Sequence, residues 1–180
     1  MKSTTILFVL LLTSVCSAQA PKVAEPNAPS KITIAPKEEP GERLVVTGTV
    51  YGPDGKPLKG VSLYVYHTDI RGHYSGETSD SSNPRLRGYI RTNSEGRYEY
   101  ETIKPGPYPS ARVPAHIHYV ATAPGYKERV FEIIFEGDPF IDERARKDSE
   151  NPESVFSLKK LERDSSGKLR CVQDIKLKRE

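Results

Sequence analysis

The chain has 180 residues, of which 36% are hydrophobic and 28% are charged, with a formal net charge of +3. That length suits one domain and is short for two, and the composition is ordinary for a soluble protein. The basic residues are spread along the sequence without forming a compact stripe, which argues against nucleic acid as a partner.

The first residues have the pattern of an export signal. Lys2 gives a short positive start, and an apolar run at 6–12, too short to cross a bilayer, is followed by small residues. We expect a signal peptide over residues 1–18, cleaved after Ala18 because Pro21 would hinder a cut two residues later. The protein is therefore predicted to be secreted or periplasmic, with no membrane association after signal removal.

The two cysteines limit the chemistry further. A lipid on Cys16 would need a small residue just before it, but Val15 stands there, so the sequence disfavours a lipoprotein. Removal of the signal leaves Cys171 alone, which excludes an intramolecular disulfide and cysteine-based zinc chemistry. We expect Cys171 to be a small buried residue in a late strand.

Residues 19–40 are rich in Pro, Ala, Lys and Glu and show no periodicity, which predicts a flexible tether. Regular structure is expected from Arg43, within one domain over 41–180. Its strand-like segments, which are β-branched or alternate in polarity, lie at 44–51, 61–66, 97–103, 116–122, 130–135, 155–161 and 169–177. The spacing predicts an all-β fold, an antiparallel β-sandwich of about seven strands with long loops.

Two further elements are expected towards the C-terminus. The last two strand-like segments should pair as a hairpin around Ser165-Ser166-Gly167. Residues 142–148 form a brief segment with a helical pattern.

The sharpest local motif is Pro114-Ala115-His116-Ile117-His118. Alternate residues of a strand point to the same face, so His116 and His118 would present two imidazoles side by side. Two neutral imidazoles on one strand make half of a metal site, although a pair of ordinary histidines is the competing interpretation. Upstream, Tyr108 lies between two prolines, in a backbone that is stiff and non-helical.

Four sequence blocks stand in a recognisable order. They are Tyr66-His67-Thr68-Asp69 with Gly72 and Tyr74, then Arg87-Gly88 through Thr92-Asn93 to Gly96 and Tyr98, then Thr102 to Pro109 followed by Pro114 to His118, and finally Phe135 to Pro139. Together, over residues 43–140, they resemble the intradiol ring-cleavage dioxygenases, the family of catechol and protocatechuate dioxygenases.

The resemblance implies an antiparallel β-sandwich and a non-haem Fe(III) ion held by Tyr74, Tyr108, His116 and His118. It also implies cleavage of a catechol-type diol by O2 to a muconate-type diacid, with Tyr108 leaving the metal and taking up a proton. Free tyrosine has a pKa of about 10, and a trivalent cation lowers the pKa of a bound phenol sharply. The expected partners are therefore a small aromatic diol and O2, and the oligomeric state stays open.

Two positions depart from the family pattern. Val113 stands where the family has an arginine, and Arg112 would face the other way in an extended chain unless a kink brought it to the substrate. Glu132 stands where the family has a glutamine, and its carboxylate would repel an anionic catecholate unless protonated or paired. Arg112 and Glu132 are the candidates for substrate binding. We expect slow turnover, because the loss of one charge-stabilising donor reduces the catalytic rate about 100- to 1000-fold.

A second hypothesis is a binding module without catalysis. Gly55 to Val61, followed by Gly96-Arg97-Tyr98, is also similar to transthyretin-like and carboxypeptidase-regulatory-like sandwiches, which usually bind no metal. The two tyrosines and two histidines distinguish the hypotheses. The tyrosines expected to serve only for packing are Tyr64, Tyr98, Tyr100 and Tyr126.

Overall fold

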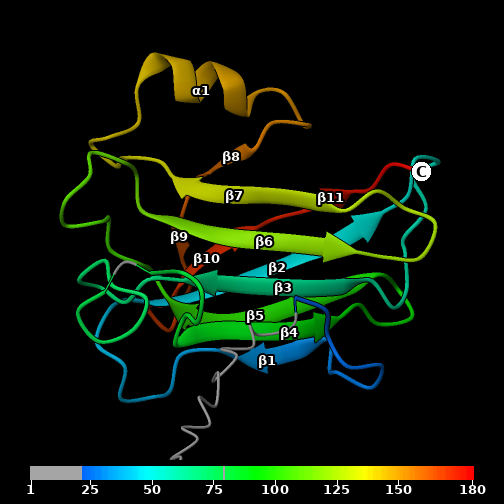
Figure 1. Cartoon of the computed structure of the whole chain (residues 1–180), viewed down its shortest axis with the longest axis horizontal. Coiled ribbons are helices and arrows are strands. Elements are labelled where there is room, and N and C mark those ends of the chain that lie inside the picture. The colour runs from blue at the N-terminus through cyan, green and yellow to red at the C-terminus, as the bar shows by residue number, and fades with distance from the viewer. Residues whose placement is uncertain (1–21, 79) are drawn as a thin grey trace, which may run out of the picture.

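A computed structural model describes residues 22–78 and 80–180, so the expected signal peptide lies outside the described residues. The described part is a β-sandwich, with a short helix beside one edge (Figure 1). The elements in chain order are β1 (Lys31–Thr33), β2 (Arg43–Tyr51), β3 (Ser62–His67), β4 (Leu86–Arg91), β5 (Arg97–Ile103), β6 (His116–Thr122), β7 (Arg129–Phe135), α1 (Glu143–Ser149), β8 (Phe156–Lys159), β9 (Glu162–Arg163), β10 (Leu169–Val172) and β11 (Ile175–Lys176).

Two sheets form the layers. One has the order β4-β3-β6-β7-β8, and the other has the order β1-β5-β2-β10-β9 with β11 also paired to β2. The all-β sandwich is confirmed, but a purely antiparallel arrangement is wrong. Strands β1, β8, β10 and β11 each run parallel to a neighbour. Strand β8, for example, runs parallel to β7 after a connection that contains α1.

Strand alternation places the core between the sheets. On β6, Ile117 and Tyr119 point inward and are fully buried, and on β2 Leu44 and Val46 meet them from the other layer. The expected packing tyrosines behave accordingly, since Tyr98, Tyr100 and Tyr64 are buried and Tyr126 packs against the core from its margin. The alternate residues of β6, which include both histidines of the motif, therefore face away from this core.

The segment before β2 differs from the expected tether. Within the described residues 22–40, β1 pairs with β5 and Ala35 is fully buried. Gly88 on β4 makes room for this segment, because a Cβ there would lie 2.4 Å from Cδ1 of Ile32 and 2.8 Å from Cγ1 of Ile34. The prediction of a flexible tether is therefore wrong for these residues. Ile32 and Ile34, although surrounded by polar residues in the sequence, pack against the space above Gly88.

Strand β4 was not among the expected strands. Leu86, Gly88 and Ile90 point inward and are buried, while the residues between them are only partly buried. The alternation is present in the sequence, but a glycine at its centre weighs against a strand when neighbours are unknown.

The C-terminal region is partly as expected. Helix α1 begins after Asp142, whose side chain accepts a hydrogen bond from the Ala145 backbone N–H at 2.7 Å. A hairpin does form around residues 165–167, but it joins β9 and β10. The pairing expected for the segment 155–161 is wrong, because β8 within it pairs with β7 and covers what would be an exposed edge of the other sheet. Cys171 is buried on β10, as predicted. No helix of the described residues is long and apolar enough to cross a membrane.

Candidate metal centre

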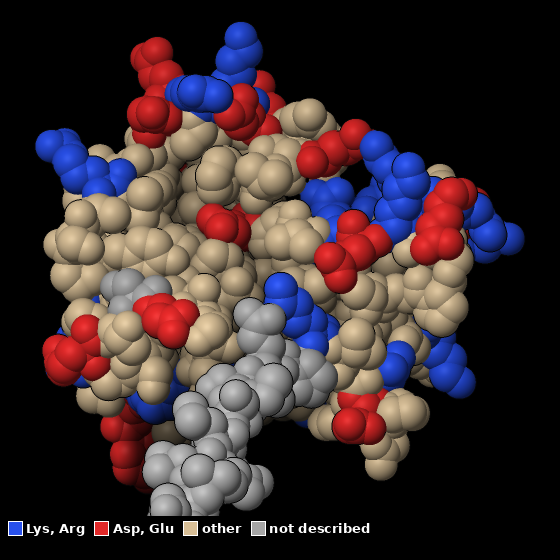
Figure 2. Space-filling model, viewed as in Figure 1, with Lys and Arg blue, Asp and Glu red and all other residues tan. Residues whose placement is uncertain are grey.

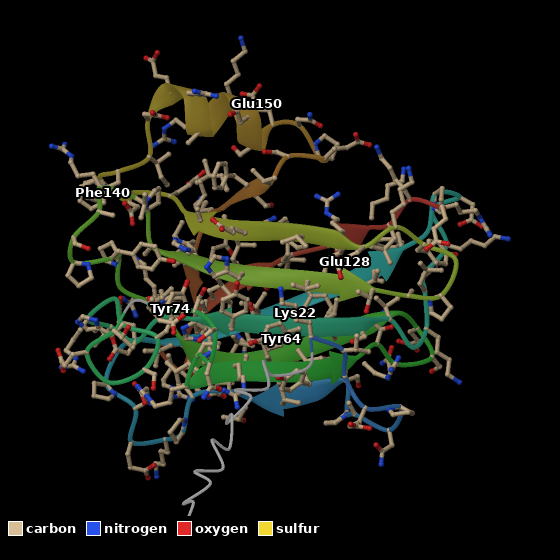
Figure 3. The ribbon with its side chains drawn as sticks, in the orientation of Figure 1. Lys22, Tyr64, Tyr74, Glu128, Phe140 and Glu150 are labelled. Carbon is tan, nitrogen blue, oxygen red and sulfur yellow. The ribbon has the colours of Figure 1, made fainter. Side chains whose placement is uncertain are left out.

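The histidine pair lies where β6 begins and where β3 and β7 end, at the left of Figure 1. His116 and His118 share the outer face of the sheet, as the alternation predicts. In the strand register, His118 stands between Tyr66 on β3 and Glu132 on β7. Figure 3 shows Tyr74 at this end of the sheet, on the side of Phe140 and far from Glu128.

Two tyrosines from separate loops complete a cluster with the histidines. The Tyr74 hydroxyl lies 2.5 Å from the Tyr108 hydroxyl and 2.6 Å from Nε2 of His118. The Tyr108 hydroxyl lies 3.1 Å from Nε2 of His116. The four residues expected to be ligands are therefore brought together, with two phenol oxygens and two imidazole nitrogens converging on one point.

The loop that carries Tyr74 is organised by Asp69. This buried carboxylate accepts backbone N–H groups from Arg71 at 2.8 Å and His73 at 3.0 Å, and closes a compact turn. Burial opposes its charge, but these hydrogen bonds and the Arg71 guanidinium hold the pKa of Asp69 below its usual value. Tyr74 follows this rigid turn directly and is only 2% exposed.

The loop that carries Tyr108 packs against the turn formed by residues 69–73 through direct backbone contacts. The Gly106 N–H donates to the Asp69 carbonyl at 3.0 Å, and the Thr68 hydroxyl donates to the Gly106 carbonyl at 2.9 Å. A Cβ on Gly106 would lie 2.1 Å from the Ile70 carbonyl oxygen. A glycine is therefore needed where the two tyrosine loops meet.

Gly106→Ala is expected to destabilise the fold by about 1–3 kcal/mol, because the new methyl forces two backbone segments apart. Denaturant unfolding measures this change. Gly52→Ala is a matched control, since its Cβ would meet first the end of the Asp54 side chain, at 3.0 Å. Equal stability of both variants and the parent would contradict the packing described for these loops.

Asp138 anchors the segment that leads into β6. One carboxylate oxygen accepts the Ala115 backbone N–H at 2.9 Å, and the other accepts the Phe140 N–H at 2.9 Å. The start of β6 is thus held in place one residue before His116. The sequence showed an aspartate in the Phe135 to Pro139 block, but it did not show that this aspartate would bind the backbone of Ala115.

Hydrogen bonds fix the tautomers of both histidines. Nδ1 of His116 donates to the Pro114 carbonyl at 2.7 Å, and Nδ1 of His118 faces a carboxylate oxygen of Glu132 at 3.0 Å. A carbonyl and an ionised carboxylate can only accept, so each Nδ1 carries the proton and each Nε2 lone pair faces the tyrosines. Both imidazoles are therefore oriented as metal ligands would be.

The electrostatics of the cluster suit a multivalent cation. Burial lowers the pKa of His116, which keeps that imidazole neutral. Burial raises the pKa of Tyr74 and, in the same direction, the pKa of Tyr108, so that both remain neutral phenols without a cation. A donor set of two phenol oxygens and two imidazole nitrogens fits a hard, highly charged metal ion, which would stabilise both phenolates.

Glu132 is paired, which removes the repulsion expected for an isolated carboxylate. Burial raises its pKa, but the hydrogen bond with His118 holds the pKa of Glu132 below its usual value. Ligand atoms of His116, His118 and Glu132 lie within 4.8 Å of one another. Because Glu132 approaches Nδ1 of His118, the imidazole ring separates it from the point where the four donors converge.

Two other sequence candidates lie apart from the cluster. Arg112 is exposed, with its guanidinium 5.9 Å from the centre of the Phe140 ring, and it makes no hydrogen bond or ion pair with the four converging residues. The position of Arg112 over Phe140 keeps it apart from the four residues, and its role in binding a substrate stays a prediction. His67 is buried, and its ring nitrogens contact the Thr68 carbonyl and the Thr102 hydroxyl.

Comparisons with known proteins agree on one family. Residues 19–178 match the model of the dioxygenase family Dioxygenase_C. Over 121 residues the chain is 36% identical to catechol 1,2-dioxygenase 2 of Acinetobacter lwoffii, a match that covers 57% of this chain and 43% of the relative. It is 34% identical over 112 residues to the protocatechuate 3,4-dioxygenase beta chain of Burkholderia cepacia, with 56% and 48% covered. The chain thus spans less than half the length of these relatives.

Solved structures show the same fold. The 3-chlorocatechol 1,2-dioxygenase of Rhodococcus opacus 1CP superposes with a TM-score of 0.68 at 26% identity, over 93% of this chain and 73% of that one. The dioxygenase domain of a dioxygenase carbohydrate-binding fusion from Streptomyces sp. SirexAA-E gives a TM-score of 0.64 at 27% identity. This match covers 91% of the chain and 97% of that domain, so a dioxygenase domain of this size has a precedent.

Proposed function

The chain belongs to the intradiol dioxygenase family, and from that premise we propose that it uses a non-haem Fe(III) ion and O2 to cleave catechol-type aromatic diols. The bond cleaved joins the two hydroxyl-bearing carbons, and the product is a muconate-type diacid. The observation that carries the proposal is the convergence of Tyr74, Tyr108, His116 and His118.

These four residues would hold the iron. When bound, Fe(III) supplies a Lewis acid that binds both oxygens of the diol and activates the ring towards O2. His116 and His118 are fixed on one strand by their Nδ1 hydrogen bonds, so they are suited to stay in place during turnover. The donor set also explains why cysteine or carboxylate ligands are not needed for this site.

Tyr108 is the tyrosine best placed to exchange protons with a substrate. Its side chain is partly exposed and lies between the exposed Pro107 and Pro109, whereas Tyr74 is 2% exposed and packed behind it. We assign Tyr108 the role of accepting a proton from the incoming diol at its phenol oxygen, while Tyr74 remains in position. Figure 2 shows that the left part of the face in view, below α1, is mostly uncharged apart from one acidic group near its centre, which suits an aromatic substrate.

The purified protein is expected to contain about one iron per chain and to be reddish, because tyrosinate-to-Fe(III) charge transfer absorbs visible light. With catechol it should consume one O2 per diol and form a diacid. Metal analysis, a visible spectrum and an oxygen electrode test these expectations together. A colourless, iron-free protein from iron-replete cells would contradict the proposal and favour the binding module.

Export of the protein is a separate proposal that rests on residues 1–18. The positive start, the short apolar run and the small residues support it. N-terminal sequencing of the mature protein tests it, with a new N-terminus at position 19 as the expected result.

A further inference from the structure

The two imidazoles of the cluster are held by acceptors of different charge. Nδ1 of His116 donates to the backbone carbonyl of Pro114, which is neutral. Nδ1 of His118 donates to the side chain of Glu132, which is ionised at neutral pH. An imidazole that donates to a carboxylate is a stronger base at its other nitrogen than one that donates to a carbonyl.

The contact between Glu132 and His118 is built into the sheet. The two residues are direct neighbours in the register of β6 and β7, while Ile134 occupies the matching position beside His116. On the opposite strand, the Tyr66 ring stacks on the His118 ring with centroids 4.4 Å apart and planes 12° from parallel. Three strands therefore fix the orientation of His118, and only one side of it carries a charge.

The surroundings keep this charge effective. The Glu132 side chain is 28% exposed and that of His118 is 15% exposed, so solvent screens the pair less than it would a surface pair. The Glu132 side chain has its hydrogen bond with His118 alone among the described residues. Glu132 is thus in direct contact with His118, while its effect on His116 acts through space, and no Lys or Arg of the described residues forms an ion pair with it.

We propose that Glu132 is a positioning residue that acts through His118 on the bound iron and favours Fe(III) over Fe(II). The inference rests on the proposed function, and it assigns Glu132 to the metal side of the site instead of the substrate side. The hydrogen bond increases electron donation from Nε2, and the added negative charge stabilises the higher oxidation state. Both effects lower the reduction potential of the iron and strengthen its retention.

Glu132→Gln tests the charge with little change in shape. We expect ferric affinity to fall about 10-fold, as for other outer partners of metal-bound histidines. A tenfold loss of preference for Fe(III) over Fe(II) corresponds to a potential higher by about 59 mV for one electron. The tyrosinate-to-iron absorption band should move to longer wavelength, because the ion becomes a better electron acceptor. Electrochemical titration of the iron-loaded protein and its visible spectrum measure both.

Two further variants separate contact from charge. Glu132→Asp keeps the charge but shortens the side chain by one methylene. If Glu132 acts on the iron through its hydrogen bond to His118, this variant should show the same change in potential and spectrum as Glu132→Gln. Glu136→Gln is the matched control, since Glu136 is exposed at the end of the same strand and its variant should keep the parental potential and spectrum.

The outcomes distinguish this inference from the proposed function. An iron-loaded Glu132→Gln protein with the parental potential and spectrum overturns the inference and leaves the dioxygenase proposal intact. Parental values in Glu132→Asp overturn the route through the hydrogen bond. A parent chain that binds no iron overturns both the function and the role of Glu132.

Discussion

His118→Ala is expected to reduce iron affinity by more than about 100-fold and to abolish catechol cleavage with it. Loss of an outer partner of a metal ligand already costs about 10- to 100-fold, and this change removes the ligand itself. It also leaves the Tyr74 hydroxyl and the Glu132 carboxylate without the contacts they make to His118 at 2.6 and 3.0 Å. Iron content per chain and oxygen uptake with catechol are the measurements.

The tyrosine variants should separate the two phenols. Tyr74→Phe removes the buried oxygen that contacts both Tyr108 and His118, so iron should be lost nearly as completely as in His118→Ala. Tyr108→Phe removes the more accessible oxygen, so some iron should remain while the charge-transfer band weakens and turnover stops.

His73→Ala is a control for these variants. His73 precedes Tyr74, but its imidazole faces Glu77, with Nε2 of His73 3.7 Å from a carboxylate oxygen. The variant should keep its iron and its colour. Full iron and unchanged absorption in both His118→Ala and Tyr108→Phe would show that the site is misassigned.

Local rules predicted the parts of the site that depend on one segment. Alternation along a strand placed His116 and His118 on one face, and the flanking prolines indicated a stiff segment around Tyr108. The pairing of the tyrosine loops could not be predicted in this way. It depends on close contacts between Gly106 and residue 70, which lie far apart in the sequence.

The sequence contained part of the information needed to predict the contact between Glu132 and His118. His118 and Glu132 are equidistant in sequence from Gly125, which has a φ of +76° in the turn between β6 and β7. A symmetric hairpin about that glycine would have made them neighbours. Choosing this register over one shifted by a residue requires knowing which face each strand buries, and this depends on the opposite sheet.

The N-terminal segment shows that amino-acid composition alone does not predict whether a segment docks on the fold. Its Pro, Lys and Glu content predicted a tether, yet β1 docks on the sandwich through Ile32 and Ile34. The space they occupy exists only because Gly88 on another strand lacks a side chain. Such complementarity between distant residues is invisible to an average over a window.

Val113→Arg is expected to raise kcat for catechol about 100-fold while changing KM much less. The family pattern has an arginine at this position, and restoring one donor that stabilises developing charge is worth about 100- to 1000-fold. Val113 is partly buried and lies just before the segment that Asp138 anchors. Arg112, the neighbouring cation, lies over the Phe140 ring. A group that acts only on the transition state changes kcat more than KM.

The structure also predicts different effects on turnover for substitutions at Val113 and at Glu132. Because Glu132 is paired with His118, Glu132→Gln alone should not increase turnover, and adding it to Val113→Arg should give no more than the single variant. Val113→Met controls for side-chain length without charge. Steady-state oxygen consumption with catechol compares the parent with these four variants. A parent that is already fast would mean that another cation fills the role. A Val113→Arg protein that holds iron and catechol without any gain in rate would favour binding over catalysis.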